Sequence, residues 1–176
     1  MTIREALRLA AARLEQAGVP DADVDAAYLL ASALKEDTLA MRINGHRELA
    51  APQRAAFDAL CDRRAAREPL QYILGETEFM GLTFHVEPGV LIPRADTEIL
   101  VEKALEWMKP GARVLDIGTG SGAIAVSLAK LGRQAQVTAV DVSDRALEIA
   151  RQNAKCNGAA VEFVKSDCFS ALKGRK

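Results

Sequence analysis

The sequence predicts an α/β protein in three consecutive parts. A helical bundle is expected over residues 1–73, a β-hairpin connector over residues 74–93, and half of a parallel sheet with its helices over residues 94–176. Apolar residues recur at helical spacing through the first part. Two short β-prone runs flank a glycine-containing turn in the second part, and strands alternate with helices in the third, as in βαβ units.

The composition is that of an ordinary globular protein. The 176 residues are 49% hydrophobic and 27% charged, with a formal net charge of −1, and no basic patch argues for nucleic-acid binding. Cys61, Cys156 and Cys168 lack the spacing of a metal site and the two histidines have no partner motif, so we expect reduced thiols and no metal. The sequence has no recognisable signal peptide or membrane span, so we expect a cytoplasmic protein without membrane contact.

The first part contains four predicted helices. Thr2 and Glu5 fit a capping box at the start of the first helix. The second runs from residue 21 or 22 to 34 with Val24 and Tyr28 on its apolar face, Asp37 caps the third, and the fourth begins around residue 52. No single helix could bury its apolar stripe alone, so a bundle is expected. Three arginines at the end of the fourth helix are predicted to form a solvated face: Arg63, Arg64 and Arg67.

The connector begins with the predicted hairpin. Its β-prone runs are Glu76–Phe79 and Leu82–Val86, separated by Met80-Gly81. The segment before Pro93 is expected to be extended, because the residue before a proline avoids the helical region. Asp96 or Thr97 then caps a helix with these apolar residues facing inward: Ile99, Leu100, Ala104, Leu105 and Met108.

Strands and helices alternate in the rest of the chain. We expect strands at Arg113–Ile117, Gln136–Asp141 and Val161–Lys165, with helices at Ser121–Leu131 and Ser143–Asn157 between them. This alternation predicts a parallel sheet with right-handed crossovers. The first strand of a doubly wound sheet lies in the middle of the sheet. With only three strands, the strand Arg113–Ile117 has no neighbour on one side, and that edge is left unpaired. We expect that apolar edge to be covered by a second copy of the chain or by a rearranged C-terminus.

The turn after the first strand, Gly118-Thr119-Gly120-Ser121-Gly122-Ala123, has two interpretations. As G-x-G-x-x-A it matches the dinucleotide-binding fingerprint, with Asp141 roughly 20 residues later, where a ribose-binding acid belongs. As D-x-G-x-G-x-G, starting at Asp116, it matches the first motif of class I methyltransferases that use S-adenosylmethionine. Both interpretations have Asp141 bind the ribose hydroxyls.

Two further carboxylates favour the methyl donor over a dinucleotide. Asp116 is unfavourable beside a pyrophosphate but acceptable beside a cationic sulfonium and ammonium. Asp167, just past the third strand, can accept a hydrogen bond from an adenine amino group. Each acid alone could also cap a turn or flank a helix. Together, however, Asp116, Asp141 and Asp167 follow the carboxyl ends of successive strands, where α/β sheets bind ligands.

Four segments carry a family resemblance. They are Phe79–Phe84, Val90–Glu98, Asp116–Gly122 and Ser166–Ser170. Together they resemble the release-factor glutamine methyltransferases, the HemK/PrmC family, over essentially the whole chain. Leu91-Ile92-Pro93-Arg94 is more specific to that family than the glycine turn, which many methyltransferases share.

The resemblance implies a fold, a reaction and a set of site residues. The third part would be the first half of a class I (Rossmann-like) methyltransferase sheet. Such enzymes transfer a methyl group from S-adenosylmethionine to the glutamine side-chain amide in the Gly-Gly-Gln motif of peptide-chain release factors, and the helical bundle is implied to help hold the release factor. Arg94, Thr97 and Asp116 would support the site, and the residues implied to bind the cofactor are Gly118, Thr119, Gly120, Ser121, Gly122, Asp141, Asp167 and Cys168.

The family's catalytic motif, Asn-Pro-Pro-Tyr, does not occur in the 176 residues, whose six prolines are nowhere adjacent. We therefore interpret the chain as the N-terminal portion of such an enzyme, ending before the motif, without a catalytic residue and inactive by itself. Two alternatives remain: a non-catalytic module that binds release factors, and an NAD-dependent oxidoreductase. We also expect self-association through the exposed sheet edge and no direct contact with nucleic acid.

Overall fold

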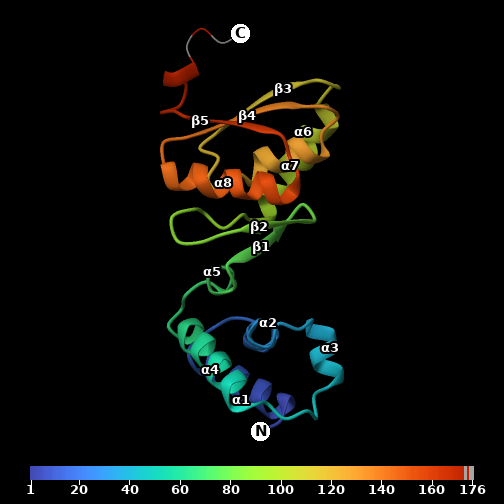
Figure 1. Ribbon diagram of the computed structural model, residues 1–176, viewed down its shortest axis with the longest axis vertical. Coiled ribbons are helices and arrows are strands. Elements are labelled where there is room, and N and C mark those ends of the chain that lie inside the picture. Colours follow the sequence, from blue (N-terminus) through green and yellow to red (C-terminus); the bar gives the residue numbers. More distant parts are fainter. Residues whose placement is uncertain (173, 175–176) are drawn as a thin grey trace. The chain divides into compact units, whose positions relative to one another are not determined.

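The computed structural model describes residues 1–172 and 174, in two compact units, Met1–Leu74 and Gly75–Lys176 (Figure 1). Residues 75–93, which the sequence assigned to a connector, thus group with the second unit. The domain boundaries inferred from the sequence stay a prediction. Within the described part of the chain, no helix has the length and hydrophobicity that a membrane span requires.

The first unit is built from short helices with local capping signals. Its elements are α1 (Ile3–Gln16), α2 (Ala22–Leu34), α3 (Thr38–Ile43), α4 (Ala51–Ala65) and α5 (Leu70–Leu74). The predicted capping box of α1 is present, since the Thr2 amide donates to Glu5 Oε2 at 2.8 Å and the Glu5 amide donates to Thr2 Oγ1 at 3.3 Å. The Asp37 carboxylate caps α3 as predicted.

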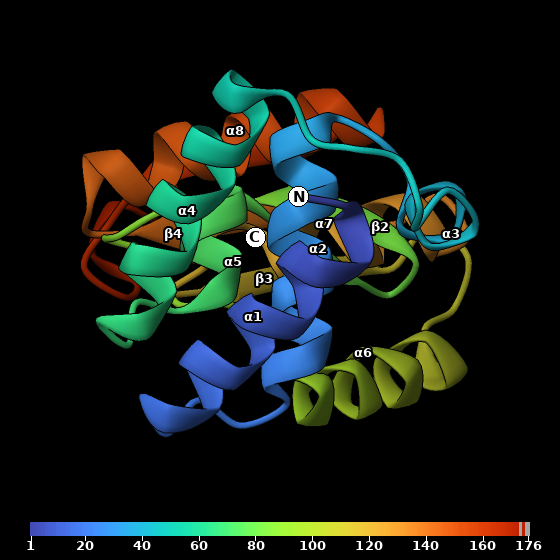
Figure 2. The same cartoon turned by 90° about the horizontal axis from the view of Figure 1, so that it is seen from below.

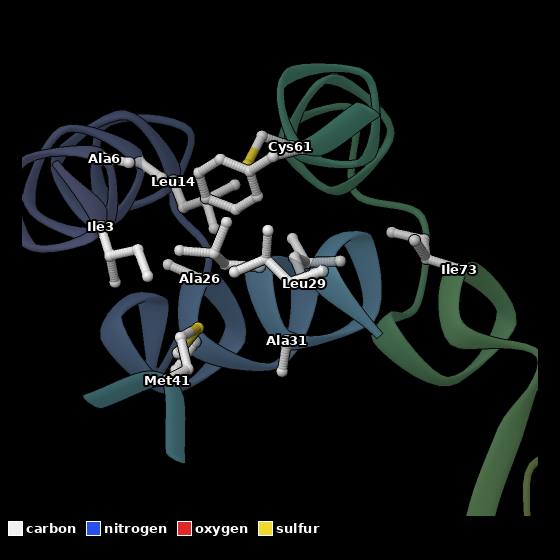
Figure 3. Packing of buried hydrophobic residues seen from close by; sticks show 14 of the residues in the cluster. Ile3, Ala6, Leu14, Ala26, Leu29, Ala31, Met41, Cys61 and Ile73 are labelled. Atoms are coloured by element: carbon white, nitrogen blue, oxygen red, sulfur yellow. The ribbon is translucent and has the colours of Figure 1, made fainter. Parts of the chain in front are cut away.

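The core of this unit lies where α1, α2 and α4 pack against one another (Figures 2 and 3). Leu14 of α1, Leu29 of α2 and Phe57 of α4 are almost completely buried. Val24 and Tyr28, which were predicted to lie on the buried face of α2, are 41% and 49% exposed, so the predicted apolar face of α2 differs from the observed one. Since α2 contacts α1, α3, α4 and α5, most of its circumference is buried, and helical periodicity does not define one face.

A buried ion pair connects α2 to α4. Arg64 Nε donates to Asp25 Oδ2 at 2.7 Å, and the two side chains are only 12% and 11% exposed. The prediction that Arg64 belongs to a solvated face is therefore wrong. The sequence could not reveal this pair, because Asp25 lies 39 residues before Arg64 and only the tertiary fold brings the two together. Arg63 and Arg67 are exposed, and they bind Glu68 and the Gly18 carbonyl.

Substitution Asp25→Ala should lower the free energy of unfolding of the first unit by about 2 kcal/mol, because it leaves the Arg64 guanidinium buried without its counter-ion. Urea unfolding followed by circular dichroism measures this. The matched control is Asp58→Ala, whose ion pair with Arg54 is exposed on both sides, and this variant should change stability by less than about 0.5 kcal/mol. Equal effects of the two substitutions would contradict the role given to the buried pair.

The second unit starts with the predicted hairpin. β1 (Glu76–Phe79) and β2 (Leu82–His85) are antiparallel and joined by Met80-Gly81. Both turn residues have positive φ, 54° and 69°, as a two-residue hairpin turn of the primed type requires. The Glu98 carboxylate accepts a hydrogen bond from the Met80 amide at 2.6 Å, which supports this conformation.

The helix after the hairpin, α6 (Ala95–Trp107), differs from its prediction at the start and in its buried face. Arg94 occupies the cap position, and Asp96 lies in the first turn. Ile99 and Leu100 are 58% and 57% exposed, so the prediction that they face inward is wrong. The buried stripe instead starts at Val101, because residues 101, 104, 105 and 108 follow helical spacing without a break.

The rest of the unit confirms the predicted parallel sheet. Its elements are β3 (Arg113–Ile117), α7 (Ala123–Leu131), β4 (Gln136–Asp141), α8 (Asp144–Asn157), β5 (Val161–Lys165) and a short 3-10 turn (Ser170–Leu172). The strands are parallel in the order β3-β4-β5, so β3 lies at an edge of the described sheet. The helices α6, α7 and α8 lie on one side of the sheet (Figure 1).

The other side of the sheet has no α-helix over it in the described part of the chain, and the 3-10 turn after β5 lies on that side. Leu115 and Ile117 of β3 remain 38% and 43% exposed there, and Phe169 is 62% exposed. Exposed apolar strand residues of this kind favour association. The expected covering of the β3 edge stays a prediction.

Candidate functional site

The three acidic residues singled out in the sequence follow the carboxyl ends of neighbouring strands. Asp116 is the penultimate residue of β3, Asp141 is the last residue of β4, and Asp167 comes two residues after β5. The register pairs Ile117 with Val140 and Asp141 with Lys165, so the strand ends are level. Parallel pairing therefore gathers these carboxylates at one edge of the sheet, beside the glycine turn.

The backbone of the glycine turn is fixed by its neighbours. Gly118 N and Thr119 N both donate to Val140 O, at 2.8 and 3.0 Å, and Gly122 N donates to Thr119 O at 2.8 Å. Gly118, Gly120 and Gly122 have φ of 75°, 56° and 81°, which only glycine adopts readily. These bonds tie the turn to β4 and close it just before α7.

The glycines of the turn face two different environments. A Cβ atom on Gly122 would lie 3.0 Å from Ala150 Cβ of α8, so the turn packs directly on that helix. A Cβ on Gly118 or Gly120 would meet no atom within 4 Å. The turn is therefore closed toward α8 and open at Gly118 and Gly120, where a ligand can approach the backbone.

Asp141 joins the turn to the start of α8. Its Oδ2 accepts from Gly120 N at 3.0 Å, and its Oδ1 accepts from Ser143 N at 2.9 Å. Each carboxylate oxygen can accept a second hydrogen bond. The half-buried carboxylate is thus held in one orientation and keeps acceptor capacity for a ligand with adjacent hydroxyls.

Asp116 is held by the turn that follows it. Its Oδ2 accepts from Thr119 Oγ1 at 2.7 Å, and Thr119 is itself buried. Burial raises the pKa of the Asp116 carboxyl above its ordinary value, the negative charge of Asp141 raises it further, and the Thr119 hydroxyl opposes the shift. A cationic ligand group near Asp116 would be stabilised by this carboxylate.

Because the folded-state pKa of Asp116 is raised, the unfolded chain ionises first as the pH rises, and the folded state loses stability above the ordinary pKa. We expect Asp116→Asn to remove this loss. The free energy of unfolding of the variant should rise relative to wild type between about pH 4 and pH 7, by about 1.4 kcal/mol for each unit of pKa shift.

Urea titrations at the two pH values measure this effect, and the asparagine keeps an oxygen that can accept from Thr119. The matched variant is Thr119→Val, which removes the hydroxyl that favours the charged carboxylate. The free energy of unfolding of this variant should fall more than that of wild type as the pH rises. A stability difference independent of pH in Asp116→Asn would contradict the raised pKa.

Asp167 and Cys168 lie in a compact exposed turn after β5. Buried Ser166 organises it, because Ser166 Oγ donates to Cys168 O at 2.8 Å and accepts from Ala171 N at 3.0 Å. Cys168 has a φ of 45°, an uncommon value for a residue with a side chain. The Asp167 amide donates to Ser170 Oγ at 3.2 Å, and its carboxylate is exposed.

Arg94 and Thr97 are located at the start of α6. The Thr97 amide donates to Arg94 O at 2.9 Å, which is a bond of the first helical turn. Among the hydrogen bonds and ion pairs of the described residues, none joins either side chain to the glycine turn. Their supporting role stays a prediction.

Sequence reasoning missed Asn153. It is 1% exposed on α8, and its Nδ2 donates to Ser121 O of the glycine turn at 2.8 Å. A signal for it exists, since Asn153 interrupts the apolar face formed by Ala146, Ile149, Ala150 and Ala154. A polar residue at a buried helical position needs hydrogen-bond partners.

Comparison with known proteins identifies two domains. Residues 5–75 match the model of the PrmC N-terminal domain, and residues 108–174 match that of a methyltransferase domain. Among solved structures, the ribosomal protein L11 methylase from Lactobacillus delbrueckii subsp. bulgaricus is 32% identical to this chain. The match covers 50% of this chain and 46% of the methylase chain, with a TM-score of 0.43.

The curated relatives match almost the whole chain. The release factor glutamine methyltransferase of Geobacter sulfurreducens is 46% identical over 171 residues, which are 97% of this chain and 60% of that protein. The enzyme of the same name from Koribacter versatilis is 45% identical over 175 residues, 98% of this chain and 62% of that protein. The chain thus spans less than two thirds of the length of these relatives. By this identity and by both domain matches, the chain is similar to the release factor glutamine methyltransferases over almost its whole length.

Proposed function

We propose that the chain binds S-adenosylmethionine at the glycine turn and forms the cofactor half of an enzyme that methylates a glutamine side-chain amide of peptide-chain release factors, in their Gly-Gly-Gln motif. The names of the curated relatives support the reaction and the substrate. The observation that carries the cofactor assignment is Asp141, fixed by Gly120 N and Ser143 N beside a turn that is open at Gly118 and Gly120.

Each part of the cofactor has residues of suitable chemistry. Asp141 accepts hydrogen bonds from the two ribose hydroxyls through the free lone pairs of its oxygens. Gly118–Gly122 follow the methionine part, because backbone without side chains permits close approach. Asp116 favours the positive charge of the sulfonium and ammonium. Asp167 accepts from the adenine amino group, with Cys168 beside the ring.

The cofactor supplies an activated methyl group, and the rest of the reaction is positioning. An amide nitrogen is a poor nucleophile because its lone pair is delocalised into the carbonyl group. It must be held in line with the transferred methyl group by hydrogen bonds to its N–H and C=O. The family's Asn-Pro-Pro-Tyr motif does this, and the 176 residues do not contain it. We therefore propose that the chain by itself binds the cofactor without transferring the methyl group.

Calorimetry with S-adenosylhomocysteine and with NAD tests the cofactor proposal. We expect binding of S-adenosylhomocysteine and none of NAD at the same concentration. Binding of NAD alone would favour the oxidoreductase. Incubation with a release factor and labelled S-adenosylmethionine tests the remainder, and label on the Gly-Gly-Gln glutamine would overturn the proposed inactivity.

Capture of a release factor without any binding of S-adenosylhomocysteine would favour a non-catalytic binding module. Contact between the helical bundle and the release factor, a cytoplasmic location and self-association through the β3 edge stay predictions.

A further inference from the structure

Two asparagines of α8 bind the outer edge of β2, which runs alongside that helix (Figure 1). Asn153 Oδ1 accepts from His85 N at 2.7 Å, and Asn153 Nδ2 donates to His85 O at 3.0 Å. One turn further along, Asn157 Nδ2 donates to Thr83 O at 2.8 Å. These side-chain amides thus hydrogen-bond the outer peptide groups of β2, as a neighbouring third strand would.

The direction of the peptide groups explains why these atoms need partners. Val86 N donates across the hairpin to Gly75 O at 3.0 Å. Successive peptide groups of a strand point to alternate sides, so the N–H and C=O groups of His85 and Thr83 point away from β1. Without the asparagines, the peptide groups of His85 would be unpaired beside the buried core residues Phe84 and Val86.

Asn153 contacts the glycine turn as well as the hairpin. Its Nδ2 donates to Ser121 O at 2.8 Å, so a single buried amide bonds to segments 32 and 68 residues away in the sequence. Two donors and one acceptor oxygen are available on such a side chain, and all three groups are used here. Asn157 differs in this respect, since its second bond is to Asn153 O at 3.0 Å, within its own helix.

The carbonyl oxygen that Asn153 binds, Ser121 O, belongs to the last peptide group of the glycine turn before α7. Ser121 O belongs to the peptide whose nitrogen is Gly122 N, and that nitrogen donates to Thr119 O. Fixing the carbonyl therefore fixes the orientation of the amide that completes the turn before α7. Preorganisation of this kind raises affinity, because the ligand does not have to order the loop.

We propose that Asn153 is a positioning residue of the cofactor site, through which the β1–β2 hairpin and the glycine turn are coupled. The inference rests on the proposed function only in identifying the ligand of the turn. A coupling free energy is reciprocal. Cofactor bound at the turn therefore protects the hairpin, and loss of the Asn153 bonds weakens cofactor binding.

The test combines three variants of the full chain with two measurements. Asn153→Ala removes all three bonds, while Asn153→Asp keeps the size of the side chain and the oxygen that accepts from His85 N but removes both donors. Asn157→Ala is the matched control, because it breaks a hairpin bond on the same helix without touching the turn. Calorimetry gives the affinity for S-adenosylhomocysteine, and amide hydrogen exchange follows Gly122 and the hairpin.

We expect both Asn153 variants to weaken binding by about tenfold or more, as loss of a buried hydrogen bond implies. Exchange should become faster at Gly122 and in the hairpin of these variants, whereas Asn157→Ala should accelerate only the hairpin and change affinity by less than about threefold. Bound S-adenosylhomocysteine should slow hairpin exchange in wild type and in Asn157→Ala but not in the Asn153 variants.

An Asn153→Asp protein that melts at a lower temperature yet binds S-adenosylhomocysteine as tightly as wild type would overturn the coupling and leave Asn153 a structural residue. If wild type does not bind S-adenosylhomocysteine, the proposed function fails, and the exchange data still decide the link. In that case, faster exchange at Gly122 in the Asn153 variants but not in Asn157→Ala supports the link, and unchanged exchange at Gly122 overturns it.

Discussion

Asp141→Ala is expected to weaken binding of S-adenosylhomocysteine by about 100-fold, because it removes charge-assisted hydrogen bonds worth about 1.5–3 kcal/mol each. The carboxylate is proposed to hold both ribose hydroxyls. It also accepts from Gly120 N and Ser143 N, so its loss removes the side-chain bond that joins Gly120 of the turn to the end of β4. Isothermal titration calorimetry measures the change in affinity.

Two further variants sharpen this prediction. Asp141→Asn should also weaken binding strongly, because both oxygens accept backbone hydrogen bonds and an asparagine would present its NH2 group to one of these donors. The control is Asp144→Ala, which removes an exposed carboxylate paired with Lys165 at 2.6 Å and should leave affinity within about threefold of wild type. Asp141→Ala with an affinity within that same range would refute the ribose assignment.

Gly122→Ala is expected to be the most destabilising single substitution in the turn, at about 3 kcal/mol. A side chain at φ of 81° costs about 1–2 kcal/mol, and a Cβ at 3.0 Å from Ala150 Cβ and 3.2 Å from Ala150 Cα adds a clash with a packed helix. Urea unfolding measures the loss, and the displaced turn should also bind S-adenosylhomocysteine more weakly.

The two contributions can be separated. Gly118 has a similar φ of 75°, but a Cβ there would meet no atom within 4 Å. Gly118→Ala should therefore lower the free energy of unfolding only by the cost of the positive φ. Combining Gly122→Ala with Ala150→Gly removes the nearest clashing atom, so the double variant should be about 1 kcal/mol more stable than the sum of the two single effects predicts. Strict additivity of the two substitutions would show that the packing of the turn on α8 has no energetic weight.

The elements of the second unit could be predicted where their signals are local. The bounds of β3, β4 and β5 agree with the prediction, because short apolar runs are delimited by glycines and polar residues next to them in sequence. The meeting of Asp116, Asp141 and Asp167 at one edge also follows from strand order alone, since the carboxyl ends of parallel strands share an edge.

The features that the sequence did not reveal depend on partners far away in the chain. Arg64 has the spacing of a surface residue, yet its side chain is only 12% exposed and pairs with Asp25, which is distant in the sequence. Asn153 looks like an ordinary polar residue of a helix, and its partners Ser121 and His85 are known only from the tertiary structure. The buried face of α6 was misassigned because Ile99 and Leu100 are apolar but exposed, which hydrophobicity alone does not indicate.

The hairpin is bound to α8 through its main chain, and this affects how freely its sequence can drift. Asn153 and Asn157 contact peptide groups of β2, and Phe79 and Phe84 supply the buried anchors. The side chains of Glu76, Glu78 and Thr83 are exposed and free of that constraint. Over evolutionary time the charge of the exposed face of this ribbon could therefore diversify between lineages, or be redesigned in the laboratory, while the main-chain bonds that connect it through Asn153 to the glycine turn are kept.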